Sequence, residues 1–184
     1  MLGTYISVGD DCIAIKSGKI YMAQKEKTPT EDMTVRQCCM RDGHGAVTVG
    51  SEIAAGVKDV HIRDCMFMNT DRGLRVKTRR GRGKLSVLDD ISFENIDMDN
   101  VMTPFVVNSF YFCDPDGKTE MLVLESRFLL MTEHLQSRAL HLRISMRKTA
   151  MLQVHIYLVC QRVKLRSLHL RILTSAMLKM QSRG

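Results

Sequence analysis

The chain has 184 residues, with 27 Lys or Arg against 20 Asp or Glu, and its net charge of +7 is unevenly distributed. Residues 121–184 hold eleven basic residues and two Glu, whereas residues 1–120 hold sixteen basic and eighteen acidic residues. The excess of positive charge therefore does not indicate that the first part of the chain binds nucleic acid. No apolar run reaches the roughly 18 residues of a membrane-spanning helix, which argues against membrane insertion.

The six cysteines are irregularly spaced and include no Cys-x-x-Cys motif, so we expect neither a disulfide scaffold nor a zinc site. The N-terminus shows no basic segment followed by an apolar one, so the sequence predicts no signal peptide in this chain. Because the repeat described below is incomplete at this end, the absence leaves the cellular location open.

Two adjacent carboxylates, Asp10 and Asp11, form the first motif along the chain. They lie in the segment Gly9-Asp10-Asp11-Cys12-Ile13-Ala14-Ile15-Lys16-Ser17-Gly18. In a regular strand neighbouring side chains point to opposite faces, so both aspartates can act at one site only if the chain bends, and Gly9 can supply the bend. An Asp-Asp pair by itself is typical of a solvated turn. Its interpretation therefore depends on the motifs that follow.

Residues 33–98 contain three copies of one apolar pattern, which begin 27 and 31 residues apart. The copies are Met33-x-Val35-x-x-Cys38-x-Met40, Val60-x-Ile62-x-x-Cys65-x-Phe67 and Ile91-x-Phe93-x-x-Ile96-x-Met98. Each copy has a further apolar residue downstream in one shared column, which contains Ile15, Val49, Val76 and Val107. The segments have period two and no helical stripe. Such units stack to bury their apolar faces, which predicts an all-β parallel β-helix of about four coils, with rungs about 4.8 Å apart.

The alignment of the repeats brings charged residues into common columns. Asp10, His44 and Asp71 fall in one column, so Asp10 and His44 are expected to project from successive rungs at nearly the same place. Arg75 and Lys77 are separated by one residue and therefore share the outward face of their strand. The sequence thus predicts one site that combines carboxylates, an imidazole and two cations.

These residues also have ordinary structural interpretations. A single histidine is more often a surface or core residue than a functional one, but the glycines on both sides of His44 would let a sugar ring approach the backbone. Arg75 and Lys77 would equally suit a solvated strand face, although a guanidinium fork beside an ammonium matches the carboxylate on every ring of a polyuronide. Gly50 is expected to leave an open space between Lys16 and Lys77.

The order, spacing and flanking residues of these motifs resemble the polygalacturonases of glycoside hydrolase family 28, from about Tyr5 to Glu120. The resemblance implies a right-handed parallel β-helix and inverting hydrolysis of α-1,4-galacturonosyl linkages in pectin. The implied partner is galacturonan, an anionic polysaccharide, with no nucleic acid, membrane, metal or cofactor. Members of the family are often secreted or periplasmic.

The resemblance also implies a role for each residue of the site. Asp10 resembles the general acid, and Asp11 resembles one of two carboxylates that hold and activate the attacking water. His44 resembles the residue that tunes the protonation of the acid. Arg75 and Lys77 resemble the clamp for the substrate carboxylate. In an inverting glycosidase the carboxyl groups are about 6.5 to 9.5 Å apart, which leaves room for the water.

The sequence departs from the family in one respect. The third aspartate of the family lies in an Asn-Thr-Asp motif about one coil before the Asp-Asp pair, and only nine residues precede Asp10 here. We therefore expect an N-terminally truncated family member with weak or no activity. Asp71 continues the column but lies on the other side of His44, so it is not an obvious replacement.

The basic tail, residues 121–184, has a different composition from the β-helix domain, residues 1–120. The segment Leu-His-Leu-Arg-Ile occurs at 140–144 and again at 168–172. A codon series for Phe-Thr-Phe-Glu-Asp-Ile gives Leu-His-Leu-Arg-Ile when it is read one base later, and a related segment is present in frame at 91–96. The repeat indicates a shift of reading frame after about residue 120, with a disordered or helical tail. The alternative is a basic amphipathic segment that binds a membrane or nucleic acid.

Three functions remain open at this point. The first is a family 28 hydrolase. The second is a non-catalytic polyuronide-binding fragment, for which Arg75, Lys77 and the arginine-rich loop at 79–84 would suffice. The third is a basic interaction protein that acts through this loop and the tail, and its binding would fall steeply with salt. A calcium-dependent pectate lyase would share the β-helix, but the Gly-His-Gly and Arg-x-Lys motifs argue against it.

Overall fold

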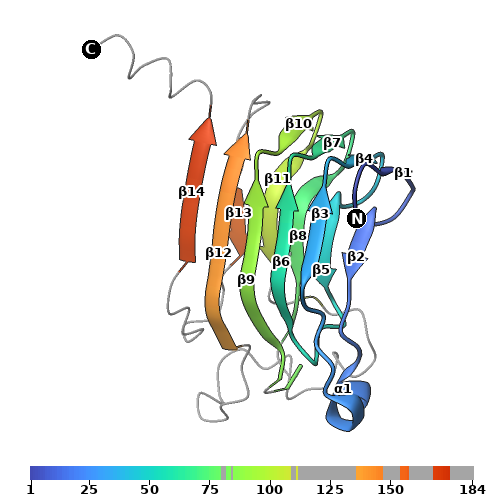
Figure 1. Cartoon of the computed structure of the whole chain (residues 1–184), viewed down its shortest axis with the longest axis vertical. Coiled ribbons are helices and arrows are strands. Elements are labelled where there is room, and N and C mark those ends of the chain that lie inside the picture. The colour runs from blue at the N-terminus through green and yellow to red at the C-terminus, as the bar shows by residue number, and fades with distance from the viewer. Residues whose placement is uncertain are drawn as a thin grey trace.

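The computed structural model describes residues 1–79, 82–83, 85–108 and 111 in full, and the backbone of residues 136–146, 154–157 and 168–174. The described strands stack in parallel into a three-sided solenoid, with the first rung at one end and the last strand at the other (Figure 1). The predicted all-β parallel β-helix is therefore confirmed.

Three parallel sheets form the sides of the solenoid. The first sheet contains β1 (Tyr5–Ser7), β4 (Cys39–Arg41), β7 (Met66–Met68) and β10 (Asp97–Asp99). The second contains β2 (Ile13–Ile15), β5 (Val47–Gly50), β8 (Arg72–Lys77), β11 (Thr103–Asn108) and β13 (Val154–Tyr157). The third contains β3 (Met33–Arg36), β6 (Val57–Arg63), β9 (Val87–Glu94), β12 (Gln136–Met146) and β14 (Leu168–Thr174). The strands β3 to β11 thus make three complete rungs after the incomplete rung of β1 and β2.

The registers of the strands place the repeat residues in interior columns. In the second sheet, Ile15 pairs with Val49, Val49 with Val76, and Val76 with Val107. A second column holds Cys38, Cys65 and Ile96, which belong to one buried core cluster. Parallel stacking of like residues fills the narrow interior without helices, because each rung covers the apolar face of the next. The columns read from the sequence are those of the structure.

Left-handed residues form the corners of the rungs. One corner column consists of Gln37, Asp64 and Asn95, and another of Asp42, Asn69 and Asn100, all with φ between 51° and 64°. Asn and Asp tolerate this conformation better than other non-glycine residues. Their side chains also bond between rungs: Asn95 Nδ2 donates to Asp64 Oδ1 at 2.6 Å, and Asn100 Nδ2 to Asn69 Oδ1 at 2.9 Å.

A short helix, α1 (Ile20–Glu26), was not predicted from the sequence. It lies between β2 and β3 and buries Ala23 against Ala54 and Ala55, with Ile20 packed alongside. No side chain caps its N-terminus. The seven residues bury so little surface that they leave no apolar stripe for sequence analysis to detect.

The described parts of the tail are strands, where the sequence analysis expected disorder or helix. β12 pairs in parallel with β9, and the two copies of Leu-His-Leu-Arg-Ile pair residue for residue, from Leu140 with Leu168 to Ile144 with Ile172. Without β12, the outer edge of β9 would have unpaired backbone N–H and C=O groups, and a following segment of extended chain can bond to them. Among the described residues, no helix is long and apolar enough to cross a membrane.

Candidate active site

The two adjacent aspartates lie in different environments. The chain bends at Gly9 and Asp10, before β2 begins. Asp10 is exposed, and its Oδ1 accepts the backbone N–H of Asp11 at 2.8 Å. The Asp11 side chain turns the other way and is only 6% exposed. The bend therefore leaves the Asp10 carboxyl group in solvent, whereas the Asp11 carboxyl group is buried.

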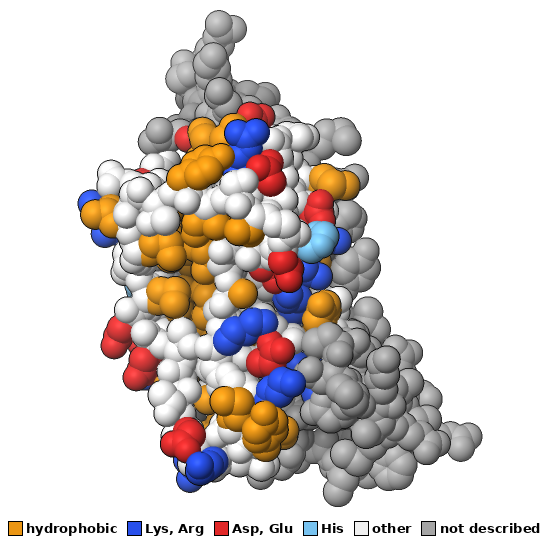
Figure 2. All heavy atoms as spheres, turned by 90° about the vertical axis from the view of Figure 1, so that its right-hand side faces the viewer, with side chains coloured by type: hydrophobic (Ala, Val, Ile, Leu, Met, Phe, Trp, Pro, Cys, Tyr) orange, Lys and Arg blue, Asp and Glu red, His pale blue; other side chains and the backbone are white. Residues whose placement is uncertain are grey.

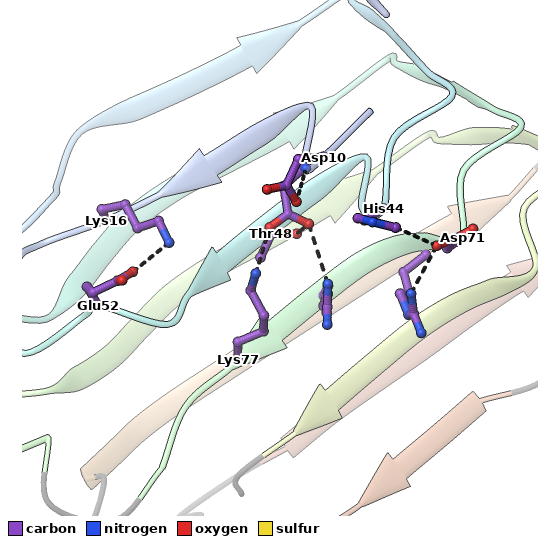
Figure 3. Close-up of polar contacts among 10 residues, drawn as sticks. Asp10, Lys16, His44, Thr48, Glu52, Asp71 and Lys77 are labelled. Atoms are coloured by element: carbon purple, nitrogen blue, oxygen red, sulfur yellow. Dashed lines mark hydrogen bonds and ion pairs between the residues drawn. The ribbon is translucent and has the colours of Figure 1, made fainter. Parts of the chain in front are cut away.

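The carboxylate of Asp11 is held by three side chains from β5 and β8. Thr48 Oγ1 donates to Oδ1 at 2.8 Å, Lys77 Nζ donates to Oδ2 at 2.7 Å, and Arg75 Nη1 lies 3.6 Å from Oδ1 (Figure 3). Burial raises the pKa of Asp11, but the hydrogen bonds from Lys77 and Thr48 and the charges of Lys77 and Arg75 outweigh it. The pKa of Asp11 therefore lies below its ordinary value, and the group is ionised at neutral pH.

The two cations do not share the same exposure. The Lys77 side chain is 8% exposed, so Lys77 mainly holds Asp11, whereas the Arg75 side chain is 17% exposed. Both cations lie over the ring of Tyr111, at 5.5 Å for Arg75 and 5.1 Å for Lys77 from the ring centroid. Tyr111 was not predicted as a site residue, because it falls outside the repeat columns. Its backbone N–H bonds to the carbonyl of Thr78, so it continues the stacking next to β8.

The glycines on either side of His44, Gly43 and Gly45, allow neighbouring residues of the protein to pack against the backbone. A Cβ at Gly43 would lie 2.5 Å from the carbonyl oxygen of Asp10. A Cβ at Gly45 would lie 2.8 Å from Asp11 Oδ1 and would also collide with the hydroxyl of Thr48. The expected approach of a sugar ring is thus not what these glycines provide, because the neighbouring rung already fills the space.

Gly50 likewise leaves no open space between the two lysines. Its φ is 111°, and a Cβ there would collide with the carbonyl oxygen of Lys77. Lys16, on the other side, pairs with Glu52 at 2.6 Å. The expected gap is filled by the close approach of β5 and β8.

His44 lies between Asp10 and Asp71, as the shared column predicts (Figure 3). Its backbone N–H donates to the carbonyl of Asp10 at 3.1 Å, and its Nδ1 lies 2.8 Å from Asp71 Oδ2. Arg72 Nη1 approaches the same carboxylate oxygen at 3.2 Å. All five predicted site residues thus lie on, or just before, the neighbouring strands β2, β5 and β8 of the second sheet.

The family model for glycosyl hydrolases family 28 matches residues 1–121, which contain every residue of this site. The chain belongs to glycosyl hydrolase family 28. A probable polygalacturonase of Vitis vinifera is 32% identical over 114 residues, and an exopolygalacturonase of Arabidopsis thaliana is 34% identical over 115 residues. These alignments cover 61% and 60% of the chain but 23% of each relative. The chain therefore spans about a quarter of the length of these curated relatives.

A similar fold is also found in a solved structure. The crystal structure of a hyperthermoactive exopolygalacturonase from Thermotoga maritima superposes with a TM-score of 0.58 at 24% identity. The match covers 80% of this chain and 31% of that one. At this identity the similarity concerns the fold.

The surface around the family 28 site is charged along one edge. Figure 2 shows the end of the solenoid with the first rung, where hydrophobic side chains form a central strip beside an edge of acidic, basic and histidine side chains.

Of the arginine-rich loop, Arg79 and Arg82 are buried, while Arg80, Gly81 and Lys84 lie outside the described residues. The described residues contain no cluster of three or more His, Cys, Asp or Glu that could hold a metal ion.

Proposed function

We propose that this site hydrolyses α-1,4-galacturonosyl linkages in the polygalacturonate chain of pectin, with inversion at the anomeric carbon. The observation that carries the proposal is the pair of adjacent carboxyl groups in opposite environments, Asp10 exposed and Asp11 held by Thr48 and Lys77. An inverting glycosidase needs one carboxyl group that gives a proton and another that accepts one.

In this proposal Asp11 is the base and Asp10 the acid. Asp11 stays ionised because Lys77 and Thr48 bond to its charged form. It orients a water and accepts a proton from it as the water oxygen bonds to the anomeric carbon. Asp10 gives its proton to the glycosidic oxygen as the bond from that oxygen to the anomeric carbon breaks. Solvent then restores both protonation states.

We propose that Arg75 and Tyr111 contact the substrate, and that Lys77, which is less exposed, supports them. Arg75 Nη1 lies 3.6 Å from Asp11 Oδ1, and the guanidinium has five N–H donors, so we assign the remaining donors to the carboxylate of a galacturonate ring. The Tyr111 ring keeps both cations in place through cation–π contacts.

We propose that this chain by itself is a weak enzyme. In the family a second water-binding carboxylate belongs to an Asn-Thr-Asp motif before the Asp-Asp pair, and residues 1–9 contain no aspartate. The chain has Asn69-Thr70-Asp71, but His44 separates Asp71 from Asp10. Loss of one general-base partner typically lowers the rate about 10²- to 10⁴-fold.

The test is release of reducing ends from polygalacturonate, followed by NMR of the first anomer formed. Asp10→Asn and Asp11→Asn should each abolish the residual activity, and the first product should have the β configuration. A retained activity in Asp10→Asn, or a first product with the α configuration, would contradict the proposal.

Polyuronide binding without catalysis is a second candidate, favoured by the two cations, Arg75 and Lys77, that lie over the Tyr111 ring. Oligogalacturonate would then bind with an affinity that Arg75→Met lowers and Asp10→Asn does not. Binding of nucleic acid or anionic vesicles instead, with a steep loss on added salt, would indicate a basic interaction protein.

A further inference from the structure

The carboxylate of Asp71 is the one group that bonds to the ring of His44 among the contacts of the described site. Asp71 Oδ2 lies 2.8 Å from His44 Nδ1, and Asp71 follows β7 one rung above the histidine. The side chains are 39% and 57% exposed, so the pair lies at the surface of the site. A carboxylate has no hydrogen to give when ionised, so the proton of this bond must belong to Nδ1.

The backbone and one neighbour hold Asp71 in this position. Its N–H donates to the carbonyl of Gly43 at 3.1 Å, and its carbonyl accepts the N–H of Thr103 at 2.9 Å. Arg72 Nη1 lies 3.2 Å from the same Oδ2. The backbone of Asp71 is thus hydrogen-bonded to the rungs below and above. Its carboxylate is also held by the guanidinium of Arg72, which can only donate hydrogen bonds.

We propose that Asp71 is a positioning residue of the site, which holds His44 with Nδ1 protonated. In the neutral ring this leaves Nε2 as a hydrogen-bond acceptor on the side away from Asp71. An acceptor there suits a neighbour such as Asp10, which must carry a proton before it acts as the acid. This catalytic role rests on the proposed function, whereas the hydrogen bond and the tautomer do not.

The substitution Asp71→Ala tests the tautomer, because it removes the acceptor of the Nδ1–H bond. The neutral ring is then free to carry its proton on Nε2. Asp71→Asn is the conservative comparison. Arg72 donates to the same Oδ2 that His44 contacts, so it should hold the amide oxygen at that position and leave Nδ1 protonated.

The chain also contains a matched control. His61 Nδ1 bonds to Ser92 Oγ at 2.8 Å, across one rung of the third sheet. That pair lines a separate hollow of about 310 Å³ with Thr34, Arg63 and Glu94. Ser92→Ala therefore removes a histidine partner of similar geometry away from the site, and it should alter neither the His44 spectrum nor hydrolysis.

The deciding experiment is a long-range ¹⁵N–¹H NMR spectrum of the full chain at a pH where the histidines are neutral, with His44 assigned by His44→Asn. We expect the Nδ1–H pattern in the unsubstituted chain and in Asp71→Asn, and mainly the Nε2–H pattern in Asp71→Ala. An Nε2–H pattern in the unsubstituted chain, or an unchanged Nδ1–H pattern in Asp71→Ala, would overturn the inference.

The kinetic arm tests the catalytic role. Asp71→Ala should lower kcat by about tenfold or more with KM nearly unchanged, whereas Asp71→Asn should keep most of the activity. Asp71→Ala should have no further effect when His44→Asn is already present. An equal loss in the His44→Asn background would show that Asp71 does not act through His44. Absence of hydrolysis by the unsubstituted chain would refute the proposed function and leave the tautomer result to stand by itself.

Discussion

The ammonium group of Lys77 lies 2.7 Å from Oδ2 of Asp11, and the two side chains are 8% and 6% exposed. A charge pair so far from water stabilises the fold only while both partners are present, because removing one leaves the other buried without compensation. The same contact keeps Asp11 ionised in the centre of the site. Stability and the proposed chemistry therefore depend on one ion pair.

Lys77→Met should lower the free energy of unfolding by about 3 kcal/mol, because it leaves Asp11 buried with fewer donors. Urea denaturation followed by circular dichroism measures the change. Lys16→Met is the matched control, since Lys16 pairs with Glu52 at 2.6 Å but at 42% and 25% exposure. That exposed pair should contribute no more than about 1 kcal/mol. Equal losses in the two variants would show that Lys77 is not a buried partner.

The contribution of Asp11 to stability should depend on pH in one direction. Its pKa in the folded chain lies below the ordinary value of 3.8, so the unfolded chain binds the proton more readily. The stabilisation is therefore fully present above that ordinary value and is lost as the pH falls through the lower folded pKa.

The free energy of unfolding of the wild-type chain should thus exceed that of Asp11→Asn at pH 6, and the difference should shrink at lower pH. Denaturation series at several pH values measure it. A difference that grows on acidification would mean that the pKa of Asp11 is raised in the folded chain.

Gly45→Ala should disturb the site, because the added Cβ would lie 2.8 Å from Asp11 Oδ1 and would collide with Thr48. Crowding of this kind costs about 1 to 3 kcal/mol, and the displaced carboxylate should also lower oligogalacturonate hydrolysis. At Gly9 a Cβ would meet nothing within 4 Å, so Gly9→Ala is the control and should change stability by about 0.5 kcal/mol or less. Similar behaviour of the two variants would contradict the packing described at Gly45.

The sequence alone was sufficient for the architecture because a parallel β-helix repeats its constraints. Ile15, Val49, Val76 and Val107 occupy one column in the sequence and in the structure. The same alignment brought Asp10 and His44 together. The column in which a residue lies depends on the number of residues between turns, and this number can be counted in the sequence.

Other features depend on distances that the repeat does not encode. The shared column predicted that Asp71 lies near His44, but it predicted neither their hydrogen bond nor the burial of Lys77, because both depend on how far side chains reach across rungs. Tyr111 lies after the last repeat column, and α1 occupies an insertion with no apolar stripe. The roles of the glycines were misjudged because a missing side chain can admit either a ligand or the next rung.

We further predict that residues 121–184 come from a shifted reading frame. The family match ends at residue 121, where the composition changes. The codons for residues 140–144 and 168–172, read one base earlier, should encode strand segments of the type Phe-x-Phe-Glu-x-Ile. Sequencing of the gene tests this. Stop codons or segments without that pattern in the earlier frame would favour a genuine basic tail.

The most direct measurement is the rate of reducing-end release from polygalacturonate by two proteins. One is the 184-residue chain, and the other carries residues 1–120 between the preceding and following coils of the Vitis vinifera relative, with an Asn-Thr-Asp motif placed one coil before Asp10. We predict weak hydrolysis by the first, hydrolysis about 10²-fold faster or more by the second, and loss of the activity of the second on Asp10→Asn. Equal rates from the two proteins, or full activity of the Asp10→Asn variant, would contradict the proposed mechanism.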